Sequence, residues 1–281
     1  MAKVTPEVQQ KTLKVPGASL YYETRGSGPV LVCIPGGPAD HGAFSKLTDE
    51  LAPNYTVVTY DPRGLSRSPL EGPFDDERAI EINADDAGRL ISAVTNGKAN
   101  VLASSGGAVI SMELAMRHSD QIATLVPHEI PAAAVVPDPD ASRRAMIDVT
   151  DTYKREGLGA AFPKFAEHIG IRGGGPPPQH GEPTAEQLES MAMFQRNMDF
   201  WFGHTMRAIA LYEPDFEALN KVSCRIVSGV GDESRGELAH EGGLGLANLL
   251  GIETAYFPGG HGGFESHAPG FAIKLREVLG S

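Results

Sequence analysis

A serine at position 105 stands where a strand-like run meets a helix-like run, and its neighbours are small. Residues 101–108 read VLASSGGA, so Ala103 lies two residues before Ser105 and Gly107 two residues after it. A serine on a sharp strand-to-helix turn needs such neighbours, because larger side chains would clash with the tight backbone. The turn exposes the hydroxyl group at the amino end of a helix, where partial positive charge favours an anion. We therefore predict that Ser105 is a nucleophile; Ser104 lacks a small residue two places before it.

A serine hydroxyl group is a poor nucleophile until a base takes its proton. His261 lies in PGGHGGF (258–264), between a predicted last strand and a predicted last helix, with four glycines around it. Core packing does not explain a histidine in such a setting, whereas a loop that must present a base to a substrate uses this conformational freedom. We predict that His261 is the base.

The base needs a carboxylate that fixes its tautomer and stabilises the imidazolium. Asp232 follows the predicted strand 224–231, and Glu129 ends the predicted strand 122–129. Either residue gives the chain order serine, acid, histidine, which is one of the orders in which such triads occur. Because a sheet would bring both strand ends to one edge, the residues alone leave both candidates open.

Backbone amides are the expected donors to an oxyanion. The N–H of Gly106 directly follows the nucleophile, and the loop PGGP (35–38) after the strand 30–35 offers the N–H of Gly37. Glycine at this loop lets a carbonyl group approach the backbone closely. We interpret another polar turn, DPRGLSRS (61–68), as a structural feature held by local Asp–Arg and Ser–backbone bonds.

Short apolar runs alternate with helix-period segments, which predicts a mostly parallel sheet flanked by helices. The expected strands are 19–26 (an antiparallel entry strand), 30–35, 56–61, 99–104, 122–129, 224–231 and 254–259. Helices are expected at about 77–96, 106–117 and 269–279. We therefore assign residues 1–130 and 222–281 to one α/β core domain.

Residues 131–221 have a different character and predict a helical cap inserted into this core. Helical patterns cover 140–157 and 184–210, whereas RGGGPPPQHGEP (172–183) cannot form a regular element. The second pattern is apolar almost all round, so its side chains are expected to pack within the cap and to roof an apolar pocket. We place Trp201 and Met198, together with Gly36 of the core, in that substrate pocket.

Composition excludes several classes of partner. A formal net charge of −12 argues against nucleic acid and against anionic membranes, which need Lys and Arg. No run approaches the ~20 apolar residues of a membrane span, and the N-terminus lacks a secretory pattern. The two cysteines, Cys33 and Cys224, fit the core of a reduced cytoplasmic protein. We expect no metal and no other cofactor, and a monomer or homodimer.

Taken together, these residues resemble the α/β-hydrolase superfamily from about residue 12 to residue 279. More narrowly, the chain resembles a bacterial hydrolase group with a PGG oxyanion loop, a YDPRGxSRSP turn, an SSGGA elbow, an HExP segment and a PGGHGG histidine loop. It is also similar to the zearalenone lactone hydrolases, in which the glutamate of the HExP segment is the acid. This resemblance implies Glu129 as the acid, with Asp232 as the alternative.

The expected function is that of a serine hydrolase that cleaves a medium-sized apolar carboxylic ester or lactone through an acyl-enzyme. The resemblance also leaves room for a cofactor-free haloperoxidase or a C–C bond hydrolase with the same fold and triad, because fold alone does not determine chemistry. A ligand-binding protein without activity is the third hypothesis, and such members usually lack a triad residue.

Overall fold

A nine-stranded sheet forms the centre of the computed structural model, which describes residues 7–170 and 183–280. In spatial order it contains β1 (Val8–Val15), β2 (Ala18–Arg25), β4 (Thr56–Tyr60), β3 (Val30–Ile34), β5 (Ala99–Ser104), β6 (Ile122–His128), β8 (Ser228–Gly231) and β9 (Thr254–Phe257). The short β7 (Arg225–Ile226) also pairs with β6. The β1–β2 and β2–β4 pairs are antiparallel, and the pairs from β4 to β9 are parallel. The predicted fold class is confirmed.

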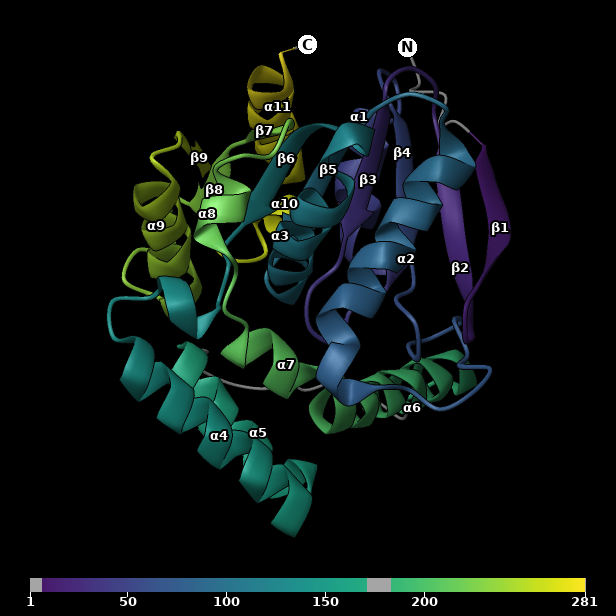
Figure 1. Cartoon of the computed structure of the whole chain (residues 1–281). Coiled ribbons are helices and arrows are strands. Elements are labelled where there is room, and N and C mark those ends of the chain that lie inside the picture. The colour runs from purple at the N-terminus through teal and green to yellow at the C-terminus, as the bar shows by residue number, and fades with distance from the viewer. Residues whose placement is uncertain (1–6, 171–182, 281) are drawn as a thin grey trace.

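Helices cover both faces of this sheet (Figure 1). One face carries α2 (Ala79–Val94), α3 (Gly106–His118), α8 (Phe216–Leu219) and α9 (Leu238–Leu250), whose apolar side chains join one core cluster. The other face carries α1 (Ser45–Leu51), α10 (Gly263–Ser266) and α11 (Ala268–Leu279), which pack on a second cluster. Short 3-10 turns lie at His41–Phe44, Asp76–Arg78, Ser119–Gln121 and Ala133–Val135. The sheet is therefore a middle layer with helices on both sides.

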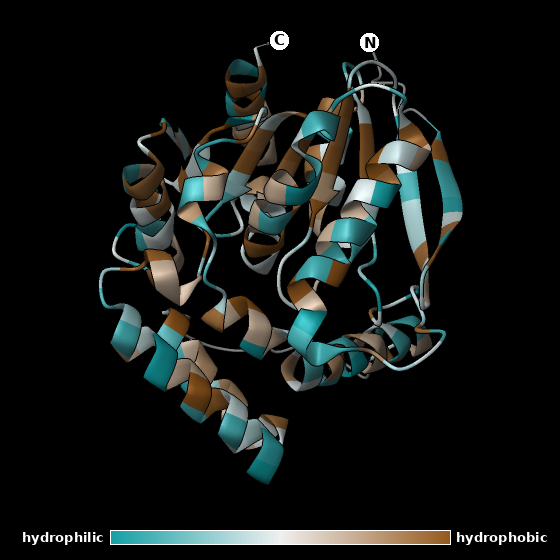
Figure 2. Cartoon of the chain, in the orientation of Figure 1, coloured by the Kyte–Doolittle hydropathy of each residue, from teal (hydrophilic) through white to brown (hydrophobic). Residues whose placement is uncertain are grey.

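The central strands are apolar on both faces because both faces are covered. In β3, Val32 and Ile34 belong to the first cluster, whereas Leu31 and Cys33 belong to the second. Figure 2 shows these strands as hydrophobic between helices whose outer sides are hydrophilic. Cys33 and Cys224 are both buried and free, as predicted for core thiols.

The chain between β6 and β7 contains the helices that we call the cap: α4 (Pro139–Glu156), α5 (Leu158–Ile169), α6 (Ala185–Phe200), the π-helix Trp201–Thr205 and α7 (Met206–Leu211). They lie beyond the carboxyl ends of the parallel strands (Figure 1). Met146, Val149, Ala161, Met198, Trp201, Phe202, Met206 and Ala210 form their own hydrophobic cluster. Most of the segment 172–183 that was expected to be irregular lies outside the described residues.

The helical pattern 184–210 is confirmed, because α6, the π-helix and α7 follow one another without a break, with a change of backbone bonding at the π-helix. One expectation for this part of the chain was wrong. Met191 and Phe194 were expected to be buried, but they are 58% and 57% exposed on α6. The apolar character of α6 therefore continues onto its outer surface.

The turn after β4 has the structural role that we predicted. The Asp61 carboxylate accepts the N–H groups of His41 and Arg67, each at 3.0 Å, and the Ser68 hydroxyl donates to the Asp61 carbonyl at 2.6 Å. Arg63 turns inward and forms a buried two-bond ion pair with Asp86, with both N–O distances at 2.7 Å. The polar groups of this turn bind each other, which fixes its shape.

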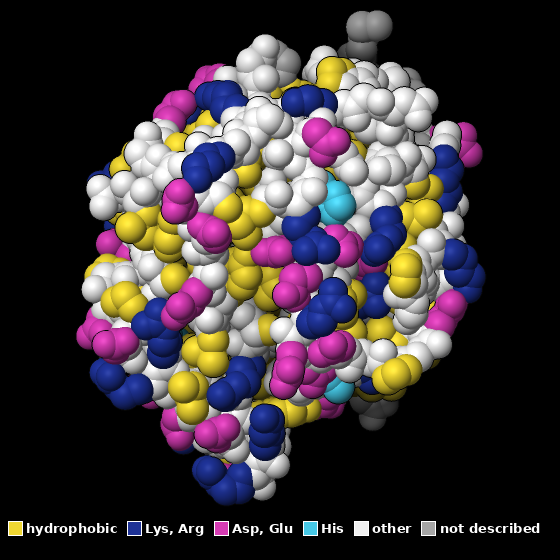
Figure 3. All heavy atoms as spheres, viewed as in Figure 1, with side chains coloured by type: hydrophobic (Ala, Val, Ile, Leu, Met, Phe, Trp, Pro, Cys, Tyr) yellow, Lys and Arg dark blue, Asp and Glu magenta, His cyan; other side chains and the backbone are white. Residues whose placement is uncertain are grey.

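The surface is polar, with charges of both signs. On the face seen in Figure 3, Lys and Arg side chains are interspersed with Asp and Glu. Several are paired, such as Arg117 with Asp85 at 2.8 Å and Arg143 with Glu213 at 2.6 Å. Exposed pairs of this kind contribute little to stability. Within the described ranges, no helix combines the length and the apolar character needed to span a bilayer.

Candidate active site

Ser105 occupies a strained turn between β5 and α3. Its backbone has φ 55° and ψ −122°, a conformation that non-glycine residues rarely adopt. The turn is held by a bond from the Ser105 N–H to the carbonyl of His128, at 2.9 Å. A Cβ atom on Gly107 would lie 2.5 Å from the carbonyl oxygen of Ile34. Glycine two residues after the serine therefore lets the turn pack directly on the end of β3.

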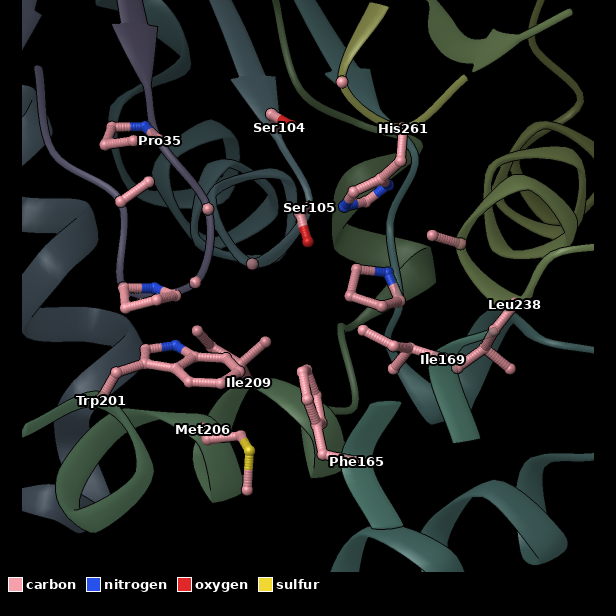
Figure 4. A pocket seen from close by; sticks show the side chains of 18 of the residues that line it. Pro35, Ser104, Ser105, Phe165, Ile169, Trp201, Met206, Ile209, Leu238 and His261 are labelled. Carbon is pink, nitrogen blue, oxygen red and sulfur yellow. The ribbon is translucent and has the colours of Figure 1, made fainter. Parts of the chain in front are cut away.

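His261 lies in the loop after β9, and its side chain is 43% exposed. Its Nδ1 atom is 2.8 Å from Oε2 of Glu129. His261 and Ser105 line the same cavity. Figure 4 shows the imidazole beside the Ser105 side chain, with a ring nitrogen turned toward it. The bond to Glu129 places a proton on Nδ1, which leaves Nε2 free to accept one.

Glu129 directly follows β6 and is completely buried. Its backbone has φ 53°, and its N–H donates to the carbonyl of Gly229 at 2.9 Å. Oε1 accepts hydrogen bonds from the N–H of Gly231, at 2.9 Å, and from the hydroxyl group of Ser234. Burial alone would raise the pKa of this carboxyl group, but the hydrogen bond from His261, the electrostatic effect of the adjacent His128 and the hydrogen bond from Ser234 together lower the pKa to about 2. Glu129 is therefore an anion at neutral pH.

Asp232, the alternative acid, lies just past β8 and is exposed. Its backbone N–H donates to the carbonyl of Phe257 at 2.9 Å. Its carboxylate has no hydrogen-bond or ion-pair partner within residues 7–170 and 183–280. The structure thus brings Glu129, and not Asp232, to the imidazole of His261.

Gly37 lies next to Gly106, the residue that follows the nucleophile. A Cβ atom on Gly106 would be 3.3 Å from the amide nitrogen of Gly37, and Gly37 has φ 57°. Neither amide donates a hydrogen bond to another residue of the described part of the chain. Gly36 lies against the elbow so tightly that a Cβ atom there would come 2.6 Å from Cβ of Ser105. The loop after β3 therefore presents its backbone to the same space as the serine hydroxyl group.

A cavity of about 500 Å³ opens above these groups. Gly36 and Trp201, which we expect in a substrate pocket, line this cavity, whereas Met198 is not among its described lining residues and packs in the cap cluster instead. Figure 4 shows side chains from the cap as its far wall. These are Phe165, Ile169, Trp201, Met206 and Ile209. Among the described lining residues there is no Lys or Arg, and Glu237 is the single carboxylate.

Several residues of this site could not be predicted from the sequence, because no local pattern marks them as part of a site. Ser234 reaches Glu129 through folding alone, because 105 positions separate the two residues. Phe165 and Ile209 look like ordinary apolar residues of amphipathic helices. Their place in the cavity depends on how the cap packs on the core.

One other cluster has the chemistry of a metal site. Potential ligand atoms of Asp40, His41 and Asp61 lie within 4.8 Å of one another. The guanidinium group of Arg67 already lies there, with Nε 3.3 Å from Asp61 Oδ2 and Nη2 2.7 Å from His41 Nδ1. This cation balances the buried carboxylate, so we assign no metal to the cluster.

Comparison with known proteins identifies the family to which the chain belongs. A family model described as "alpha/beta hydrolase fold" matches residues 29–158. The uncharacterized hydrolase YraK of Bacillus subtilis (strain 168) is 32% identical over 281 residues, which cover 97% of this chain and 96% of that protein. Zearalenone hydrolase of Bionectria ochroleuca is 29% identical over 128 residues, or 43% of this chain and 47% of that one.

A solved structure shares the fold across the whole chain. The enol-lactonase from Burkholderia xenovorans LB400 superposes with a TM-score of 0.69 at 19% identity, covering 96% of this chain and 100% of its own. With the relative from Bacillus subtilis, which matches nearly the full length, this result defines the class. The chain belongs to the α/β-hydrolase family. It is a hydrolase of the α/β-hydrolase fold, with a helical insertion after β6.

Proposed function

We propose that this hydrolase cleaves a carboxylic ester or lactone, with Ser105 as nucleophile, His261 as base and Glu129 as acid. One observation carries the proposal: His261 binds the buried Glu129 through Nδ1 at 2.8 Å while it lines the same cavity as Ser105. A serine, an imidazole and a carboxylate in this order make a serine hydroxyl group nucleophilic.

In the first half of the reaction, Ser105 Oγ attacks the substrate carbonyl and His261 Nε2 takes the proton. Glu129 holds the Nδ1–H tautomer and stabilises the imidazolium. The N–H groups of Gly37 and Gly106 donate to the oxyanion, and a donor of this type typically contributes about 10²–10³ in rate. The leaving alkoxide then receives the proton from His261.

In the second half, the same groups act on water. His261 takes a proton from a water molecule, which attacks the acyl group on Ser105. The tetrahedral intermediate collapses, the acid product leaves, and the proton returns to Ser105 Oγ. No group beyond these side chains and amides takes part in the proposed cycle.

The cavity supports a medium-sized, apolar and uncharged substrate. Its volume is about 500 Å³, and aromatic and aliphatic side chains of the cap form its far wall. The absence of Lys and Arg from the described lining residues disfavours an anionic ligand. The names of the zearalenone hydrolase and the enol-lactonase support ester-type chemistry in this family. We place Trp201 and Gly36 in contact with the substrate.

Replacement of the nucleophile tests the proposal. Ser105→Ala should lower kcat on an aryl ester by about 10⁶-fold, and a fluorophosphonate probe should no longer label the protein. Ser111→Ala is the matched control, because Ser111 is buried in α3, the helix that follows Ser105, and its hydroxyl group donates to the carbonyl of Ala108. Unchanged turnover by Ser105→Ala would disprove the assignment. A folded wild-type protein that resists the probe and hydrolyses no ester would instead favour ligand binding without catalysis.

A further inference from the structure

The two oxygens of the Glu129 carboxylate have separate partners. Oε2 faces His261, whereas Oε1 accepts hydrogen bonds from the N–H of Gly231, the last residue of β8, and from the hydroxyl group of Ser234 in the loop after β8. This loop also carries Asp232, the residue at the alternative acid position. The Asp232 residue is exposed, whereas the end of β8 and its loop direct two hydrogen-bond donors at the carboxylate that follows β6.

Ser234 is built into this position. It is 1% exposed, and its hydroxyl group has one proton to donate, which the Glu129 oxygen accepts. The Nδ1 atom of His240, a buried residue of α9, lies 3.5 Å from Ser234 Oγ and 3.9 Å from Glu129 Oε1. The serine hydroxyl group thus fills the space between a carboxylate and an imidazole that are both shielded from water.

A glutamate needs such a partner more than an aspartate does. Its side chain has one more rotatable bond, so the hydrogen bond to His261 alone leaves the carboxylate free to rotate away from the ring plane. Bonds from Gly231 and Ser234 to the other oxygen remove that freedom. Fixing the carboxylate fixes the imidazole, and small errors of orientation in such groups reduce the rate strongly.

We propose that Ser234 is a positioning residue that acts on catalysis through Glu129. The inference rests on the proposed function, because it assigns Ser234 a role only in a reaction that uses Glu129 and His261. Ser234 touches neither the substrate nor the reacting atoms in this account. Its effect should therefore appear in turnover and not in substrate binding.

Three variants of Ser234 separate positioning from structural support. Ser234→Ala should lower kcat about tenfold, the effect of losing one hydrogen bond to a charged group, with KM unchanged. Ser234→Thr, which keeps the hydroxyl group, should restore most of kcat. Cysteine has nearly the same shape as serine, but its thiol is a weak hydrogen-bond donor. Ser234→Cys should therefore lower kcat as Ser234→Ala does, and it provides the test if the alanine variant does not fold.

Ser228→Ala is the matched control. Ser228 is also a fully buried serine, at the start of β8, but its hydroxyl group donates to the carbonyl of Gly243 and not to Glu129. Both alanine variants lose one buried hydrogen bond, and thermal unfolding measures that common loss. Only Ser234→Ala should also lose kcat. Equal kcat values in the two variants would overturn the proposal.

A second comparison uses the Glu129→Gln background. If Ser234 acts through the carboxylate, adding Ser234→Ala to Glu129→Gln should lower kcat much less than it does in the wild type. Full tenfold losses in both backgrounds would show that Ser234 acts elsewhere. Failure of the proposed function is distinguishable, because then Ser105→Ala would retain activity whatever happens at Ser234.

Discussion

Replacing Glu129 with glutamine keeps the size of the acid and changes its hydrogen-bonding pattern. The amide must direct its oxygen at one set of partners and its NH₂ group at the other. Gly231 N–H and Ser234 O–H both donate to the Oε1 position, so two bonds favour the amide oxygen there. The NH₂ group then faces Nδ1 of His261. Glu129→Gln should therefore place the wrong tautomer of His261 next to Ser105.

A histidine with its proton on Nε2 cannot take the proton of the serine. In the serine-protease triad, the equivalent replacement of the acid by its amide lowers kcat about 10⁴-fold with the geometry intact. We expect a loss of similar size for Glu129→Gln, measured as steady-state hydrolysis of an aryl ester. Asp232→Asn is the matched control, because the Asp232 carboxylate is exposed and does not reach His261.

Thermal unfolding of both variants checks that the fold is retained. The reasoning is refuted if Glu129→Gln turns over within about tenfold of the wild type while folded. A larger loss in Asp232→Asn than in Glu129→Gln would likewise show that the other carboxylate is the acid.

Two further predictions concern stability. Burial lowers the pKa of His128 to about 4, so the unfolded chain takes up a proton there below pH 6.5 while the folded chain does not. This histidine alone should lower the free energy of unfolding by about 3 kcal/mol from pH 7 to pH 4, so His128→Phe should reduce the pH dependence measured by urea titration; an unchanged pH dependence would contradict the account. Arg63→Met removes the two-bond ion pair of the buried Asp86 carboxylate, which keeps its bond to Arg89 at 3.3 Å, and should cost about 3 kcal/mol in the same assay. Arg117→Met at the exposed pair with Asp85 should cost less than about 1 kcal/mol, and equal losses would refute the difference.

The sequence was sufficient to predict those elements whose pattern lies in neighbouring residues. The buried runs of β3 to β6 and the elbow at Ser105 were located because strand, turn and helix each have their own pattern in neighbouring residues. The choice of acid could not be made in this way. β6 and β8 are adjacent in the sheet, so Glu129 and the loop with Asp232 lie near one edge, and only side-chain orientation separates them.

The elements that we missed depend on contacts distant in the chain. In α9 the sequence LAHEGGLGLANLL contains three glycines, which disfavour a helix. A Cβ atom on Gly242 would lie 1.9 Å from the carbonyl oxygen of Ile130, and one on Gly245 would lie 1.8 Å from that of Val135. Glycine is needed there because the helix packs directly on the chain that leaves β6. Likewise, β1 is mostly exposed at the sheet edge and lacks an apolar pattern.

The end of β6 has a consequence for protein engineering. The carbonyl of His128 holds the backbone of Ser105, the next residue binds His261, and Pro131 already lines the cavity. Anyone exchanging this insertion for that of a homologue would have to make the amino-terminal splice after position 131. A chimera joined three or more residues earlier, after position 128 or before it, would replace Glu129 together with the cap.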